Sequence, residues 1–138
     1  MKPKNLIYLF FAAMLVVSYG CDKEDEDTPF TLLTAHVWTS DSLLVNGQDA
    51  SGPDGMLVDF MGDAKFNTDG TGTFGNYQGT WHFSQNETQL VITTEELPFP
   101  LTAFIDELTK TDLKISSAFP NPLYPAQSLL IRMTFKAK

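Results

Sequence analysis

The sequence predicts an all-β domain, a small antiparallel up-and-down β-barrel of about eight strands. Apolar and polar residues alternate along several short segments, which is the pattern of strands with one buried face. Short polar turns separate these segments, as tight hairpins require. About eight strands of this kind can close into a small barrel, and closure removes the exposed sheet edges that would invite aggregation.

The alternation locates the strands. Trp81 and Phe83 fall on one face of their segment, and Leu113 and Ile115 fall on one face of theirs. We expect strands at 37–45, 56–67 with a bulge near Gly62, 71–75, 79–84, 89–95, 102–107, 113–118 and 127–136.

One of these segments also fits a helix. Its apolar residues Leu101, Phe104, Ile105 and Leu108 recur at a helical spacing. Periodicity alone cannot separate helix from strand over so short a run, and we expect a strand.

The connections predict two different ends of the barrel, because alternate connections of an up-and-down meander lie at the same end. Three short polar turns form one end, at 67–70, 85–88 and 109–112. Longer connections form the other end, at 46–55, 76–78, 96–101 and 119–126.

The longer connections contain the candidate binding residues. Apolar side chains in connections lose hydrophobic free energy unless something covers them, so an uncovered cluster is usually functional. Prolines stiffen the two richest connections and limit the entropy lost on binding. The alternative is that these rings fold inward and plug the barrel. The candidates for contact with a ligand or partner are Tyr77, Phe99, Phe119, Leu123 and Tyr124.

Residues 1–20 have the layout of a secretory signal peptide. Lys2 and Lys4 precede the apolar run 6–17, which is shorter than the roughly 20 apolar residues of a membrane span. The only cysteine, Cys21, follows directly and resembles the lipidated cysteine of bacterial lipoproteins, although Tyr19 departs from the usual small residue. An ordinary signal peptide beside an incidental cysteine is the alternative.

Residues 21–30 are predicted to be an acidic flexible tether, and residues 31–138 to be the barrel domain. Cleavage would leave seven basic and seventeen acidic residues, a net charge of −10, on the mature chain. Such a surface repels nucleic acid and anionic lipid headgroups. The protein would therefore be attached to the lipid bilayer through acylated Cys21 alone.

The sequence contains no motif for catalysis, for a cofactor or for a metal ion. We find no Gly-x-Ser-x-Gly elbow, no His-Glu-x-x-His segment, no phosphate-binding glycine loop and no paired cysteines. His36 and His82 each sit beside a tryptophan in strand-like sequence, where a lone histidine is most often a packing or surface residue. We therefore expect a protein that is not an enzyme.

Four segments resemble lipocalin-like domains of Bacteroidetes lipoproteins. They are 70–74, 79–83, 90–92 and 105–115. The resemblance covers nearly the whole mature domain and implies a calycin-like barrel with an internal calyx for small apolar molecules. The acidic run after Cys21 resembles the signal of surface-exposed members, which implies the outer face of the outer membrane; a plain spacer is the alternative.

The resemblance also implies structural roles for two residues. Trp38 is similar in place to the tryptophan that closes the base of a lipocalin barrel, although His36 stands where the signature has glycine. Arg132, the only arginine, lies where lipocalins stack an arginine on that tryptophan. Trp81 is interpreted as a structural residue of the core.

These observations lead to two alternative functions, which differ in the surface that makes the contact. In the first, the barrel binds a small apolar or amphipathic ligand in an internal cavity of a few hundred Å³. In the second, the barrel is solid and its longer connections contact a protein partner. An interior filled by Trp81, Phe83, Phe66 and Met133 would contradict the first.

Overall fold

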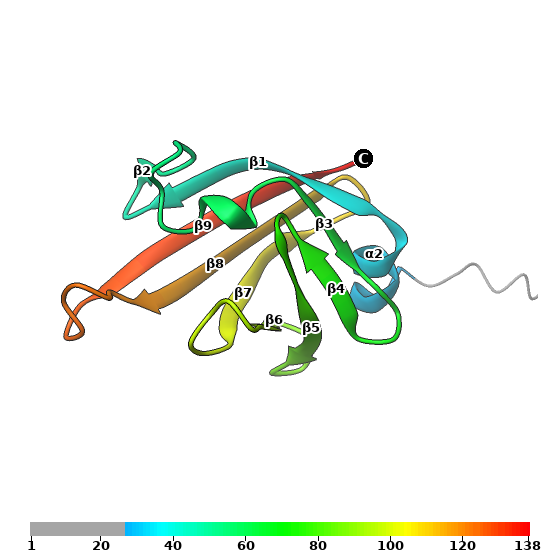
Figure 1. Cartoon of the computed structure of the whole chain (residues 1–138). Helices are drawn as coiled ribbons and strands as arrows, with labels where there is room; N and C mark the ends of the chain where they lie inside the picture. The colour runs from blue at the N-terminus through cyan, green and yellow to red at the C-terminus, as the bar shows by residue number, and fades with distance from the viewer. Residues whose placement is uncertain (1–26) are drawn as a thin grey trace, which may run out of the picture.

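Nine antiparallel strands and two short helical segments make up the described chain, residues 27–138, in this computed structural model (Figure 1). The predicted signal peptide, Cys21 and most of the predicted tether lie outside the described residues. The elements are α2 (Pro29–Ala35), β1 (Val37–Val45), β2 (Gln48–Asp49), the 3₁₀ helix η3 (Val58–Phe60), β3 (Asp63–Phe66), β4 (Thr71–Phe74), β5 (Tyr77–Ser84), β6 (Gln89–Thr94), β7 (Leu101–Leu108), β8 (Asp112–Pro120) and β9 (Ser128–Ala137).

Eight of these strands close into a barrel, which confirms the predicted fold class. Each strand from β3 to β9 pairs with its neighbour in sequence, and β1 pairs with both β3 and β9. Trp38 marks the closure, since it lies opposite Ala64 of β3 and Ala137 of β9. The two-residue strand β2 adds to β1 outside the barrel.

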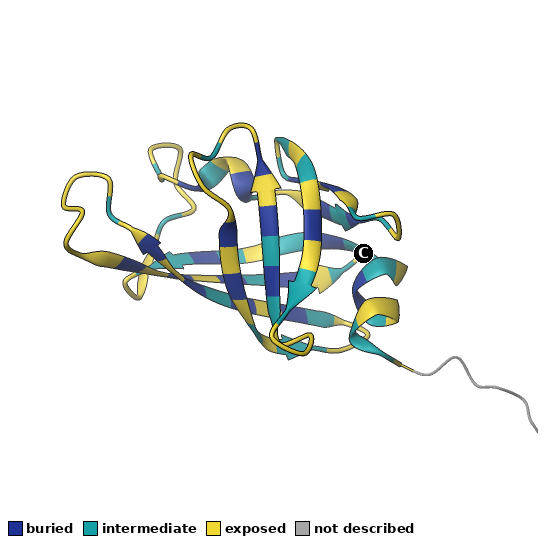
Figure 2. Cartoon of the chain, turned by 90° about the horizontal axis from the view of Figure 1, so that it is seen from below, coloured by how far each residue is buried: buried dark blue, intermediate teal, exposed yellow. Residues whose placement is uncertain are grey.

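The segment at 101–108 is a strand, as expected. It pairs with β6 and with β8, and its buried residues Leu101 and Ala103 alternate with the exposed residues Thr102 and Phe104. Burial alternates along β3, β4, β6, β8 and β9 too, and Figure 2 shows the bands of buried and exposed residues along the strands. Each strand therefore has one face toward the core and one toward solvent.

The expected long strand at 56–67 is wrong in its first half. Only residues 63–66 form β3, while residues 58–60 form η3. Leu57 and Phe60 are both buried three residues apart, and the backbone N–H of Phe60 donates to the Leu57 carbonyl at 2.9 Å. Gly62 has a φ of 117°, a conformation that residues with a Cβ rarely adopt, so the chain turns there instead of continuing a bulged strand.

Helix α2 was not predicted, and it starts within the range 21–30 interpreted as a tether. Thr28 caps it, its Oγ1 accepting a hydrogen bond from the Thr31 backbone N–H at 3.2 Å, and Pro29 opens the first turn. Leu33 is fully buried, and its carbonyl accepts a hydrogen bond from Trp38 Nε1 at 3.0 Å. The helix therefore belongs to the barrel domain.

Aromatic side chains fill the part of the barrel near α2. The ring of Phe66 lies 5.6 Å from that of Trp81, and Phe74 and Phe83 continue the cluster at 5.3 Å from Phe66 and Trp81 respectively. Phe30 of α2 adds a fifth ring, 5.9 Å from Trp81. These edge-to-face and tilted contacts are the geometries that aromatic pairs prefer.

Candidate functional site

The longer connections gather at the end of the barrel opposite α2 (Figure 1). We call this end the loop end and define it by residues 46–62, 75–76, 95–100 and 121–127. Phe99 of the connection 95–100 and Phe119 at the end of β8 show how close these parts lie, because their ring centroids are 6.0 Å apart. The expected connection at 119–126 begins two residues later than predicted, since Phe119 and Pro120 still pair with β9. The parity of the meander thus predicted which connections share an end.

An apolar groove of about 370 Å³ lies on the loop end. Three connections far apart in the sequence and the end of β8 form it, and nearly every lining residue is apolar. Its lining residues are Met56, Leu57, Leu97, Pro98, Phe99, Phe119, Pro120, Asn121, Pro122 and Pro125. A preformed apolar depression of this size is typical of sites for small molecules.

Hydrogen bonds hold the connection 121–127 that forms one wall of the groove. The backbone N–H of Asn121 donates to the Gln127 carbonyl at 3.0 Å, and that of Gln127 donates to the Tyr124 carbonyl at 2.8 Å. Asn121 Oδ1 accepts from the backbone N–H groups of Leu123, at 2.9 Å, and Tyr124, at 3.3 Å. With the prolines, these bonds reduce the entropy that the wall would lose on binding.

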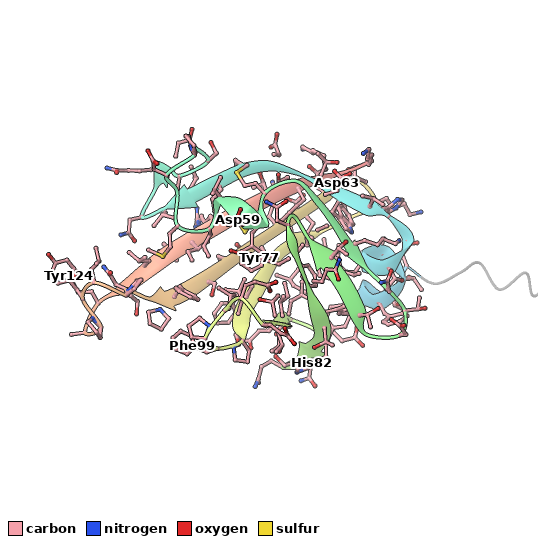
Figure 3. The ribbon with its side chains drawn as sticks, viewed as in Figure 1. Asp59, Asp63, Tyr77, His82, Phe99 and Tyr124 are labelled. Atoms are coloured by element: carbon pink, nitrogen blue, oxygen red, sulfur yellow. The ribbon has the colours of Figure 1, made fainter. Side chains whose placement is uncertain are left out.

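Only two of the five candidate binding residues line the groove. Phe119 is 7% exposed and Phe99 is 48% exposed, so one ring is largely covered and the other is half open to solvent. Leu123 and Tyr124 are more exposed, at 80% and 63%, but they do not line it. Figure 3 shows Tyr124 at the far tip of the β8–β9 hairpin, away from Phe99.

Tyr77 is a core-packed residue and not part of the groove. Its ring lies 4.7 Å from that of Phe60, and its hydroxyl donates a hydrogen bond to Asp59 Oδ2 at 3.3 Å. Burial raises the pKa of Tyr77, and the negative charge of Asp59, the hydrogen bond to Asp59 and the charge of Glu96 raise it further. The neighbourhood of Tyr77 at the loop end is therefore negative.

Met56, Leu57 and Leu97 are groove residues that the sequence reasoning missed. Met56 is 45% exposed, which is high for a large apolar side chain. The sequence predicts a strand over 56–67, so Met56 and Leu57 do not stand out there as residues of a connection. Leu97 stands between Glu96 and Pro98 in an expected connection, so its apolar character was the available signal.

The interior of the barrel is packed, which favours a solid barrel over an internal calyx. Phe66, Trp81 and Met133 are all buried, and Phe83 packs against them. The void between β7, β8 and β9, bordered by Ala103 and Ile131 among others, measures only about 10 Å³. A single water needs about this much space, so this void cannot hold a ligand of a few hundred Å³.

Arg132 does not stack on Trp38, contrary to what the family resemblance implied. Trp38 is fully buried and bonded to Leu33. Arg132 lies on the outward face of β9, opposite Leu44 and Ser116, because the alternation of the strand places Ile131 and Met133 inward. Trp38 and Trp81 are structural residues of the core, while Arg132 is an exposed residue of the barrel wall.

A larger hollow, of about 870 Å³, lies over β4, β5 and β6. Its lining is mainly polar and includes the exposed residues Thr73, Gln78, Thr80 and Thr93. Such a surface exchanges hydrogen bonds with water for hydrogen bonds with a ligand and gains little net free energy. The apolar groove is therefore the better candidate site.

The two histidines lie apart from the groove. His36 follows α2 and meets the ring of Trp38 edge-on at 5.7 Å, while His82 is exposed on β5 (Figure 3). Within residues 27–138, no group of three or more His, Cys, Asp and Glu side chains is placed to hold a metal ion. No helix in the same range is both long enough and apolar enough to cross a membrane.

No protein-family model matches this chain, and a search of curated proteins finds no match either.

Proposed function

We propose that this protein is a non-catalytic binding domain that holds the apolar part of a small amphipathic ligand in the groove at its loop end. One observation carries the proposal: an apolar groove of about 370 Å³ with the half-exposed ring of Phe99 in its wall. Burying apolar surface contributes roughly 25 cal/mol per Å². A ligand that covers this groove therefore gains affinity without an ion pair or a covalent bond.

The ligand is held at the mouth of the barrel and not inside it. The core residues leave little space in the interior, whereas the groove is open on one side. The apolar part of an amphipathic ligand can therefore enter the groove while its polar part stays in water. A lipocalin-like calyx would bind its ligand inside the barrel, whereas here the ligand binds at the mouth. The class of ligand, a small apolar or amphipathic molecule, is the same.

The lipoprotein anchor is part of the same proposal. We infer that the chain is a lipocalin-like lipoprotein, acylated at Cys21 and held at the outer membrane on the cell surface. Helix α2, where the described chain begins, lies opposite the loop end (Figure 1). Six residues lie between Cys21 and Thr28, so the seven Cα–Cα steps limit the tether to about 25 Å at full extension. The groove would then face away from the membrane.

A protein partner is the second candidate, and it is favoured by the connection 121–127. This connection carries the exposed side chains of Leu123 and Tyr124 on a hydrogen-bonded frame. Exposed tyrosine on a rigid support is typical of binding hot spots. The partner would contact the tip of the β8–β9 hairpin, outside the groove.

Native mass spectrometry of the processed protein, purified from its own host, tests the first candidate. The expected result is a non-covalent adduct that denaturation removes and that Phe99→Ala weakens. Tyr124→Ala is the matched control, since it removes an exposed aromatic ring outside the groove. An adduct that both variants retain equally, or an apo species under all conditions, would contradict groove binding.

Membrane fractionation of cells that produce Cys21→Ser tests the anchor separately. A serine cannot form the thioether that carries the lipid, so we expect the protein to leave the membrane fraction. Protease added to intact cells should degrade the unaltered protein if it lies on the outer surface. A Cys21→Ser chain that stays in the membrane fraction argues against anchoring by acylation.

A further inference from the structure

The loop end carries negative charge and no positive charge. Its connections contain five carboxylates and neither lysine nor arginine. None of these carboxylates forms an ion pair within residues 27–138. The five are Asp49, Asp54, Asp59, Glu95 and Glu96.

The lysines of the described chain are used elsewhere. Lys65 donates to the carbonyl of Thr34 at the end of α2, and Lys110 pairs with Asp27 at 3.1 Å. The other three pair with carboxylates on or beside the barrel strands, namely Lys114 with Glu107, Lys136 with Asp112 and Lys138 with Asp63. Arg132 lies on the outer wall of β9. The charge of the domain is thus unevenly distributed along the barrel axis.

Three of the loop-end carboxylates stand beside groove residues along the chain. Glu96 precedes Leu97, Asp54 is two residues before Met56, and Asp59 is two residues after Leu57. Consecutive Cα atoms are about 3.8 Å apart, so these charges lie within roughly one Debye length of the groove at physiological salt. A charged group at the groove rim is therefore incompletely screened from them.

We propose that the groove selects a cationic amphiphile: a small molecule whose apolar part occupies the groove and whose positively charged head faces the carboxylates of the rim. This inference rests on the proposed groove function and names the charge of its ligand. The inference is supported by the charge complementarity between a cationic head and the carboxylates beside the groove, which form no ion pairs in the described chain. A neutral head gains nothing from the rim, and an anionic head is repelled.

Tyr77 lies in the same negative field. Burial is the main cause of the raised pKa of its hydroxyl, and the charges of Asp59 and Glu96 raise it further. The same field stabilises a cation placed there.

Three probes with the same octyl chain test the inference: octyltrimethylammonium, octyl glucoside and octyl sulfate, each below its micelle concentration. The protein is the full chain with Cys21→Ser, which removes the site of acylation. Binding is followed residue by residue in NMR spectra at Met56, Leu97 and Phe99, so that contacts elsewhere on the chain are not counted. We expect the ammonium probe to bind about tenfold more tightly than the sulfate at low salt, and about equally at 1 M salt.

Two double variants distinguish the effect of the rim carboxylates from the effect of the net charge of the protein. Asp54→Asn with Glu96→Gln should reduce the preference for the cation, because both carboxylates stand beside groove residues along the chain. Glu87→Gln with Glu107→Gln removes the same formal charge from the β5–β6 turn and from β7, outside the loop end, and should preserve it. Equal loss of preference in both double variants would assign the effect to net charge and overturn the inference.

The failures of the two proposals are distinguishable. If all three probes shift the groove residues with equal affinity, the groove binds amphiphiles without charge selection, and only this inference is wrong. If none of them shifts the groove residues, the proposed groove function is wrong as well.

Discussion

The ring of Phe99 leans against that of Phe119, with centroids 6.0 Å apart and planes inclined by 50°. Phe119 ends in the core at 7% exposure, whereas Phe99 keeps 48% of its surface open. The pair therefore connects the packed interior to the groove: Phe119 supports the wall, and Phe99 supplies the contact surface.

Replacing Phe99 should affect binding more than folding. Because Phe99 is half exposed, Phe99→Ala should change the free energy of unfolding by less than about 1 kcal/mol. It should weaken groove binding of an octyl amphiphile by about tenfold, since the lost contact area corresponds to roughly 1–2 kcal/mol. Urea unfolding and NMR titration measure the two quantities. Tyr124→Ala, which alters a ring outside the groove, should leave the affinity unchanged.

Helix α2 should contribute to the stability of the barrel. Leu33→Ala removes a fully buried side chain and should lower the free energy of unfolding by about 2–5 kcal/mol. Leu32→Ala is the matched control, because Leu32 is only half-buried in the same helix and should cost clearly less. Equal midpoints of urea unfolding for the two variants would show that α2 does not pack as described.

Gly79 should resist substitution because the strands β5 and β6 approach closely there. A Cβ on Gly79 would overlap the backbone carbonyl of Thr93, so Gly79→Ala forces the backbone to shift. We expect a loss of about 1–3 kcal/mol in unfolding free energy. Gly52→Ala is the control, since nothing lies within 4 Å of its added Cβ. Thermal unfolding of both variants provides the comparison, and equal melting temperatures would argue against the close approach.

Tyr77 should titrate above the ordinary pKa of tyrosine. The folded state holds the phenol proton more tightly than the unfolded state does, first because of burial and then because of Asp59. The stability that this proton contributes is fully present below the unfolded pKa of about 10 and is lost as pH rises through the higher folded pKa. Ultraviolet difference titration of the unaltered protein against Tyr77→Phe measures the midpoint.

Asp59→Asn tests the second cause of that shift. It removes a charge and weakens the hydrogen bond of the Tyr77 hydroxyl, so the Tyr77 midpoint should move down toward its ordinary value. Burial by Phe60 remains, so the midpoint should stay raised. A midpoint that does not move in Asp59→Asn would show that Asp59 does not act on Tyr77.

The barrel could be predicted from the sequence because its signal is local and repeated. In β7, burial alternates from Leu101 to Phe104 even though the same residues fit a helical spacing. Alternation along each strand, together with short turns, determined the number and order of the strands and the end at which each connection lies. These features need no knowledge of distant contacts.

Helix α2 and the groove could not be predicted in this way. Seven residues are too few for a helix that is stable alone, and α2 depends on burying Leu33 and on the hydrogen bond from Trp38. Met56, Leu97 and Phe119 form one groove although more than 60 residues separate the first from the last. The sequence by itself determined the eight barrel strands, apart from the first half of 56–67, and the apolar character of the longer connections. Which apolar side chains were buried, exposed or brought together was decided by tertiary packing, because that depends on which distant residues fill the space between them.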